Sequence, residues 1–131
     1  MKPVKNSIYL LITLSIAVWG LSASGNHWRD ADRSSAGFAP LPEDHKDAVL
    51  QVYAARTVGW RGNFAVHTWI SIKEKDAQNY WVHHVLGFRS RRGLPVVVSS
   101  VDLPDRKWFG NKPDVLVDLR GTEADKLIPK V

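Results

Sequence analysis

The chain has 131 residues, of which 44% are apolar and 24% charged, a composition typical of one ordinary globular domain. Because it contains no cysteine, disulfide bonds, thiolate metal sites and a cysteine nucleophile are all excluded. The net charge of +5 is a mild excess that forms no basic stripe, so we expect no nucleic-acid partner.

Residues 1–24 have the order of an export signal: a positive start, an apolar run and then small residues. Lys2 and Lys5 precede the uncharged run 8–21, and Ser22, Ala23 and Ser24 follow it. The uncharged stretch 6–28 is also close to the ~20 residues that span a bilayer. We therefore predict either a cleaved signal peptide or a retained transmembrane helix whose partner is the lipid bilayer. In both cases the rest of the chain lies outside the cytoplasm.

Turn-like segments divide the rest of the chain into short β-type runs. Residues 25–47 are polar, contain proline and glycine, and are expected to form an extended linker. The runs that follow are 48–57, 64–73, 80–89 and 94–101, and Pro95 predicts that the last of them lies at a sheet edge. Strands of this length, joined by tight loops, predict an antiparallel meander.

The carboxyl-terminal residues carry weaker signals. Residues 102–113 are irregular, 115–119 fit either a short strand or a turn of helix, and Thr122 with Asp125 resembles a helix-capping pattern. The predicted fold class is therefore α+β: an amino-terminal transmembrane or signal helix, a small antiparallel β-meander and a short carboxyl-terminal helix. We expect 48–131 to be one extracytoplasmic β-rich domain, and its abrupt end predicts that this domain is incomplete.

The second β-type run divides between two sheet faces, because side chains alternate along a strand. The apolar face, which we expect to form the core, consists of Phe64, Val66, Thr68, Ile70 and Ile72. The other face consists of Ala65, His67, Trp69, Ser71 and Lys73. Pairing of Lys73 with Tyr80 would set Trp69 opposite His84 and make His67 a diagonal neighbour of His84. A slip of one residue would bring His83 to that place instead.

Candidate functional residues lie on this second face and in the turns. An imidazole held on a rigid strand can act as a general base, so His67 is the candidate catalytic residue. Aromatic and arginine side chains together can bind sugars, lipid headgroups or bases. The candidate binding residues are Trp60, Arg61, Trp69, His84 and Arg89.

Simpler roles stay open for these residues. A histidine beside a tryptophan on a sheet can be a packed residue, and the run Arg89, Arg91 and Arg92 fits a solvated turn as well as a contact with phosphate or anionic lipid. We predict no cofactor and no metal, although His67 and His84 could share an ion if a third ligand joined them. The chain contains no Gly-x-Ser-x-Gly, phosphate-loop or His-Glu-x-x-His motif.

A set of short motifs extends from about residue 28 to the end of the chain. It includes Gln51-Val52-Tyr53-Ala54-Ala55-Arg56-Thr57, Gly59-Trp60-Arg61-Gly62, Phe64-Ala65-Val66-His67-Thr68-Trp69-Ile70, Gly87-Phe88-Arg89 and Asp118-Leu119-Arg120-Gly121. Together these motifs resemble an uncharacterised bacterial family, domain of unknown function 3750. Members of that family look like membrane-anchored proteins with one extracytoplasmic domain, so the resemblance favours a retained anchor. It implies no activity.

The chain departs from the family pattern in two places. His83-His84 stands where the family pattern has Tyr-Glu, which disfavours a shared metal site, and family members continue beyond Val131, so the chain resembles a shortened member. We expect a membrane-anchored protein of the bacterial cell envelope, in the inner membrane with its domain facing the periplasm, acting as a binding or structural module. A protein or an envelope polymer would be its partner.

Two alternatives remain at this point. The chain could be cleaved and periplasmic. By analogy with permuted papain-like hydrolases, it could also act on envelope amide or ester bonds with His67 as the base.

Overall fold

The computed structural model describes residues 28–131, apart from the side chain of Trp60. The predicted export segment 1–24 and the first residues of the linker therefore lie outside the described residues. None of the helices within 28–131 has the length and apolar character needed to cross a membrane. Residues 31–131 form one compact unit by themselves.

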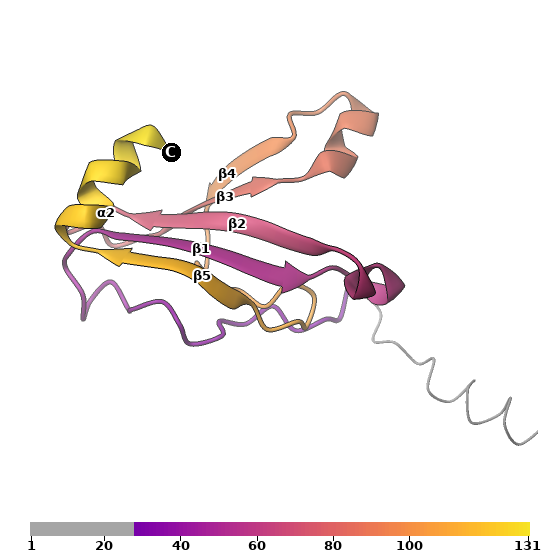
Figure 1. Cartoon of the computed structure of the whole chain (residues 1–131), viewed down its shortest axis with the longest axis horizontal. Helices are drawn as coiled ribbons and strands as arrows, with labels where there is room; N and C mark the ends of the chain where they lie inside the picture. Colours follow the sequence, from indigo (N-terminus) through magenta and orange to yellow (C-terminus); the bar gives the residue numbers. More distant parts are fainter. Residues whose placement is uncertain (1–27) are drawn as a thin grey trace, which may run out of the picture. The chain divides into compact units, whose positions relative to one another are not determined.

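The core of this unit is a five-stranded antiparallel sheet with the strand order β4-β3-β2-β1-β5 (Figure 1). The strands are β1 (Val49–Arg56), β2 (Val66–Lys73), β3 (Trp81–Val85), β4 (Val97–Val101) and β5 (Asp114–Arg120). The short helices are η1 (Gly59–Asn63), η2 (Gly87–Arg92), α2 (Thr122–Leu127) and η3 (Ile128–Lys130). The predicted antiparallel meander, its edge strand and the short carboxyl-terminal helix are all confirmed, and the ambiguous segment 115–119 belongs to a strand that pairs with β1.

Each face of the sheet has its own apolar cluster. On the face covered by α2 (Figure 1), Ala48 and Leu50 pack with Ala124 and Ile128. On the opposite face the buried residues are Tyr53, Ala55, Trp69 and Val82, with Phe38 and Trp108 packed against them. Because the second face is covered by irregular chain rather than by a helix, we call it the loop-covered face.

The prediction that 64–72 buries its apolar side chains was wrong for residues 64–68, of which Phe64 is 84% exposed. Val66 is 61% exposed, whereas Trp69 is 3% and Ser71 0% exposed on the loop-covered face. The physical reason is that α2 is short and covers only the end of the apolar face near Leu50 and Ile72. The irregular segments 31–47 and 102–113 cover much more of the opposite face.

Polar side chains of the loop-covered face hydrogen-bond to the backbone of these irregular segments. Trp69 Nε1 and Ser71 Oγ both donate to the carbonyl oxygen of Pro104 at 2.8 Å, and the Tyr80 hydroxyl donates to that of Pro40 at 2.9 Å. Lys73 Nζ donates to the carbonyl oxygen of Asp47 at 2.8 Å. Buried carbonyl groups outside regular structure need donors, so a face with polar side chains suits this covering.

Asp105 ties the two covering segments together. Its buried carboxylate accepts hydrogen bonds from the Ser35 hydroxyl at 2.7 Å and from the backbone N–H groups of Phe38 at 2.6 Å and Ala39 at 3.1 Å. The backbone N–H of Ala36 also donates to the carbonyl oxygen of Asp105. We call this arrangement the Asp105 clasp. It holds segment 31–47 against the loop that contains the candidate site.

Candidate functional site

The centre of the candidate site is a pair of hydrogen-bonded histidines on neighbouring strands. Trp69 on β2 lies opposite His84 on β3, so the predicted register is confirmed. His67 is then the diagonal neighbour of His84, and its Nε2 lies 2.9 Å from His84 Nδ1 in a hydrogen bond. The two imidazole centroids are 5.2 Å apart with an interplanar angle of 15°. His83 faces the other side of the sheet, where its Nδ1 hydrogen-bonds to Ser99 Oγ at 2.8 Å.

A tight two-residue turn places Trp108 over His67. Trp108 and Asn111 exchange two backbone hydrogen bonds of 2.9 and 3.0 Å, and both residues between them have positive φ: 49° at Phe109 and 87° at Gly110. This is the pattern of a type I′ turn, in which Gly110 is favoured and Phe109 is strained. The turn holds the Trp108 ring 3.8 Å from the His67 ring, centroid to centroid, at 20°. The strained turn therefore closes the cluster from above the sheet.

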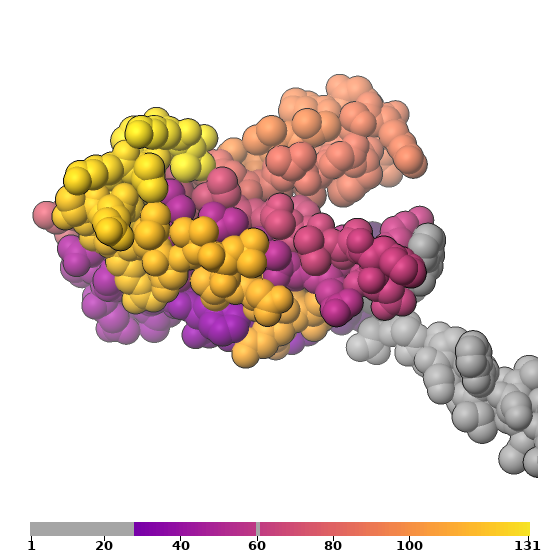
Figure 2. Space-filling model, viewed as in Figure 1, coloured from indigo at the N-terminus to yellow at the C-terminus, as the bar shows by residue number. Residues whose placement is uncertain are grey.

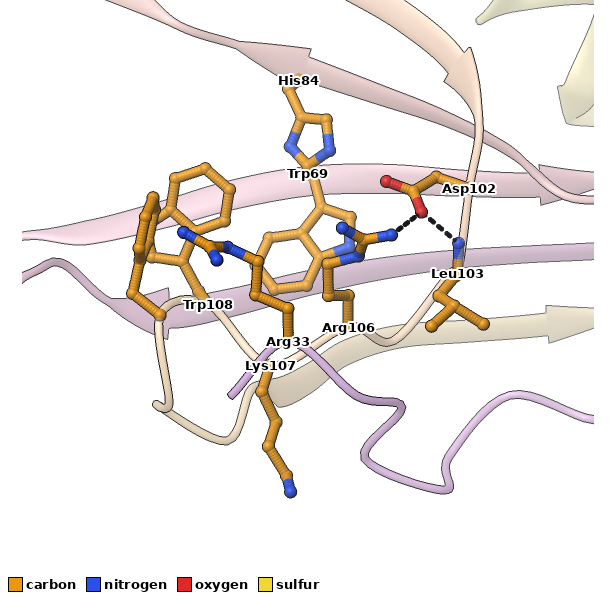
Figure 3. Close-up of a pocket in the computed structure, with 9 residues that line it drawn as sticks. Arg33, Trp69, His84, Asp102, Leu103, Arg106, Lys107 and Trp108 are labelled. Carbon is orange, nitrogen blue, oxygen red and sulfur yellow. Dashed lines mark hydrogen bonds and ion pairs between the residues drawn. The ribbon is translucent and has the colours of Figure 1, made fainter. Parts of the chain in front are cut away.

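A small hollow opens beside His84 and the two indole rings (Figure 3). Its volume is about 100 Å³, and it is lined by Arg33, Trp69, His84, Asp102, Leu103, Arg106, Lys107, Trp108 and Phe109. The Asp102 carboxylate accepts hydrogen bonds from the Arg106 guanidinium and from the Leu103 backbone N–H. Lys107 points its amine away from the hollow, where it pairs with Asp32 at 2.6 Å. Two guanidinium groups and one carboxylate thus remain in the hollow.

The hollow has a net positive charge and contains an arginine with an unused hydrogen-bond donor. Arg106 Nε is buried and has no hydrogen-bond partner among the described residues. The Arg33 guanidinium lies 4.6 Å from the centroid of the Phe109 ring, which holds it beside the hollow. Guanidinium groups bind carboxylate and phosphate through paired N–H donors, and indole faces accept flat or apolar groups. We call this hollow the anion pocket.

A second, more open groove lies on the His67 side of the cluster. It has a volume of about 330 Å³ and is lined by Thr57, Val58, Arg61, His67, Val85, Leu86, Gly87, Phe88, Trp108 and Phe109. The histidine pair therefore stands between two hollows, with His84 in the cationic one and His67 in the mostly apolar one.

Burial keeps the imidazoles of the pair uncharged. Burial, reinforced by the neighbouring His84, lowers the pKa of His67 from 6.5 to about 4. Burial also lowers the pKa of His84, and Arg106 and His83 act in the same direction against the opposing effect of Asp102. At neutral pH the pair is two neutral rings that share one hydrogen bond, with one nitrogen as donor and the other as acceptor. Such a pair can pass a proton from one ring to the other.

We expect the stability of the domain to fall as the pH drops from 6.5 to about 4. The unfolded chain takes up a proton on residue 67 in this range while the folded chain does not, so protons favour unfolding. After discounting for the partial exposure of the ring, the loss should be about 1–2 kcal/mol. Urea midpoints measured across this pH range test it. The His67→Phe variant, which keeps a ring but cannot titrate, should show a flatter profile, and equal slopes would contradict the prediction.

The structure unites only some of the residues that the sequence singled out. Trp69 and His84 lie beside His67, and Arg61 lines the groove on the His67 side. Arg89 instead lies on η2, where its Nε donates to the carbonyl oxygen of Pro95. The side chain of Trp60 lies outside the described part of the chain. The functional roles of these residues stay predictions.

Several residues of the anion pocket were missed in the sequence. Arg33, Asp102 and Arg106 come from irregular segments, which have no periodicity to place them on a face. The one available signal was the run Arg106-Lys107-Trp108-Phe109, in which cationic and aromatic residues are adjacent. As for the metal alternative, residues 28–131 contain no group of three His, Asp or Glu side chains that could hold an ion, and each ring of the pair is already bonded to the other.

The fold and the site together define a small α+β domain with a histidine–tryptophan stack beneath a strained turn. A family model described as "Protein of unknown function (DUF3750)" matches residues 47–131, and the chain belongs to this family. The predicted resemblance is thereby confirmed. Comparison with curated proteins gave no match, and comparison with solved structures gave none either.

Proposed function

We propose that this protein is a membrane-anchored cell-envelope protein whose domain binds an organic anion in the anion pocket. The observation that carries the proposal is the meeting of Arg33 and Arg106 with two indole rings around a single carboxylate. Such a set of groups favours a ligand with a carboxylate or phosphate joined to a body that has an apolar face, as a sugar ring has. The small volume of the pocket admits the anionic group, and the body of the ligand would rest on Phe109 and Leu103 at the rim.

The proposed location rests on the amino-terminal sequence. The positive start at Lys2 and Lys5, followed by the uncharged stretch 6–28, fits a helix in the bacterial inner membrane with the domain facing the periplasm, and the family resemblance favours its retention over cleavage. Recovery in the soluble periplasmic fraction of a chain that lacks residues 1–24 would exclude the anchor and show cleavage.

We expect a carboxylated sugar to bind the full chain and an uncharged sugar of the same shape not to bind. Glucuronate is the probe and glucose its uncharged counterpart, with tryptophan fluorescence as the readout, because Trp69 and Trp108 line the pocket. Arg106→Gln should weaken glucuronate binding roughly tenfold or more, since a hydrogen bond to a charged group contributes about 1.5–3 kcal/mol.

A matched control distinguishes the loss of a pocket contact from the loss of one positive charge elsewhere on the domain. Arg120 pairs with Asp118 at 2.9 Å at the end of β5 and lies outside the pocket, so Arg120→Gln removes the same charge without touching the site. Equal weakening in both variants, or equal binding of glucose and glucuronate, would show that the pocket does not recognise an anion.

The hydrolase alternative with His67 as base has one favourable observation. The ring is neutral near pH 7, as a general base must be, and it lines the open groove. Within residues 28–131, however, its side chain hydrogen-bonds to His84 and to no hydroxyl group. A binding module therefore agrees better with the geometry.

A further inference from the structure

The hairpin formed by β3, η2 and β4 carries positive charge with no acidic residue to offset it. Residues 77–101 contain three arginines and two histidines but no aspartate or glutamate. Arg91 and Arg92 are exposed on η2, and within residues 28–131 neither forms an ion pair. A hairpin with this charge favours a partner surface that is negatively charged.

The end of the same hairpin also exposes apolar side chains. Val85 and Val97 form a cross-strand pair on one face, and Val85 and Phe88 are 64% and 61% exposed. Gly93, with a φ of 65°, ends η2 in a left-handed conformation and returns the chain to the exposed Leu94. We call Val85, Phe88, Arg91, Arg92, Leu94 and Val97 the hairpin tip. Figure 2 shows this end of the hairpin, in salmon and orange, standing clear of β2.

We propose that the hairpin tip docks on the surface of an anionic lipid bilayer. Its apolar side chains enter the interface while Arg91 and Arg92 contact lipid phosphates. A surface of this kind combines apolar groups with arginine and excludes acidic groups, which anionic lipids would repel. An acidic protein could satisfy the arginines, but it would also have to supply apolar surface that fits the protruding side chains, whereas a bilayer interface offers both to any shape. Exposed apolar surface of this kind marks an interaction site.

This contact is independent of the anion pocket and of the amino-terminal segment. None of the tip residues lines the anion pocket, and only Val85 and Phe88 line the groove on the His67 side. A chain held in a membrane by its leader would gain a second point of attachment, which would fix the orientation of the domain. The test must therefore report on the tip itself rather than on whether the chain binds vesicles.

The absence of cysteine allows one label to be placed at a time. Ser90→Cys places a fluorophore on the exposed helix η2. Glu43→Cys places the same fluorophore on an exposed position of segment 31–47, which covers the loop-covered face. The full-length chain is reconstituted in vesicles of phosphatidylcholine alone or mixed with phosphatidylglycerol, each with nitroxide-labelled headgroups. We expect quenching of the label at residue 90, and not at residue 43, in the vesicles that contain phosphatidylglycerol.

Two double variants separate the contribution of charge from that of apolar contact. Arg91→Glu with Arg92→Glu should lower the partition of the tip into the interface by roughly fivefold or more per residue, and high salt should act in the same direction. Phe88→Ser with Leu94→Ser should reduce quenching while leaving both arginines in place. All four side chains are exposed, so the fold should persist, and an unchanged emission from the label at residue 43 confirms that it does.

Three outcomes would overturn the proposal. Equal quenching at residues 90 and 43 would mean that the tip has no special contact with lipid. Quenching that is the same with and without phosphatidylglycerol would exclude recognition of anionic lipid. If the label at residue 90 becomes less quenched as the protein-to-lipid ratio rises, whatever the lipid, the tip binds a second copy of the chain.

Discussion

Replacing Asp105 by alanine should destabilise the domain by about 3–4 kcal/mol, the largest effect we expect from a single substitution outside the sheet. The change removes a buried carboxylate and leaves the backbone N–H groups of Phe38 and Ala39 without acceptors. Each unsatisfied buried donor costs about 1–3 kcal/mol, and the hydrogen bond from Ser35 is lost as well. Urea denaturation of the purified chain in mild detergent, followed by tryptophan fluorescence, measures the loss.

Two further variants make this prediction specific. Asp105→Asn keeps one acceptor oxygen and should lose about half as much stability, since it can still accept a backbone N–H. Asp114→Ala removes an exposed carboxylate at the start of β5 and should stay within about 0.5 kcal/mol of the parent. If the two alanine variants were equally destabilised, the Asp105 clasp would not be what holds the covering segments.

Replacing Trp69 by alanine should cost about 3–5 kcal/mol of stability and should also loosen the candidate site. The ring is 3% exposed, stacks on Tyr53 with centroids 5.5 Å apart and donates to the Pro104 carbonyl oxygen. Its removal leaves a cavity beneath His67 and Trp108, and deletion of a buried tryptophan falls in this range. Thermal melting followed by circular dichroism measures the stability. Glucuronate binding should weaken in parallel, because one wall of the anion pocket is lost.

Trp81 provides the matched control on the neighbouring strand. It is 50% exposed, so Trp81→Ala should cost about 1 kcal/mol or less. Trp69→Phe should lose only about 1–2 kcal/mol, because it retains most of the ring and Ser71 still donates to Pro104. Equal losses for the two alanine variants would mean that burial of Trp69 contributes little.

Local patterns in the sequence were enough to predict strands β1 to β4 and the register of β2 against β3, but not the pairing of β5 with β1. Alternation along 64–73 and the turn-like residues at 74–79 define the hairpin, and its register follows once Lys73 and Tyr80 are placed at its ends. The diagonal contact of His67 with His84 is a direct geometric result of that register. The capping pattern of Thr122 and Asp125 predicted the helix that begins at Thr122, although no side chain makes a capping hydrogen bond at its start.

The choice of buried face could not be predicted in the same way. The alternation of side chains along a strand separates Trp69 and Ser71 from Val66, but it does not say which of the two faces is buried. The more apolar face is usually the buried one. Here the covering chain is irregular, and its carbonyl groups at Pro40, Asp47 and Pro104 require donors that only the polar set can supply. The anion pocket was missed for a related reason, since Arg33 and Arg106 reach it through tertiary contacts of these segments.

The Asp105 clasp has a consequence for how the domain folds. Ser35 and Asp105 are 70 residues apart in the chain, so the clasp closes a loop that encloses most of the sheet. Contacts of such long range must overcome loop-closure entropy before they contribute stability, which places them late on the folding pathway. The meander can assemble from neighbouring strands, whereas the site must wait until both of its irregular walls are held. The candidate site should therefore be the last part of the domain to form and the first to open in hydrogen exchange.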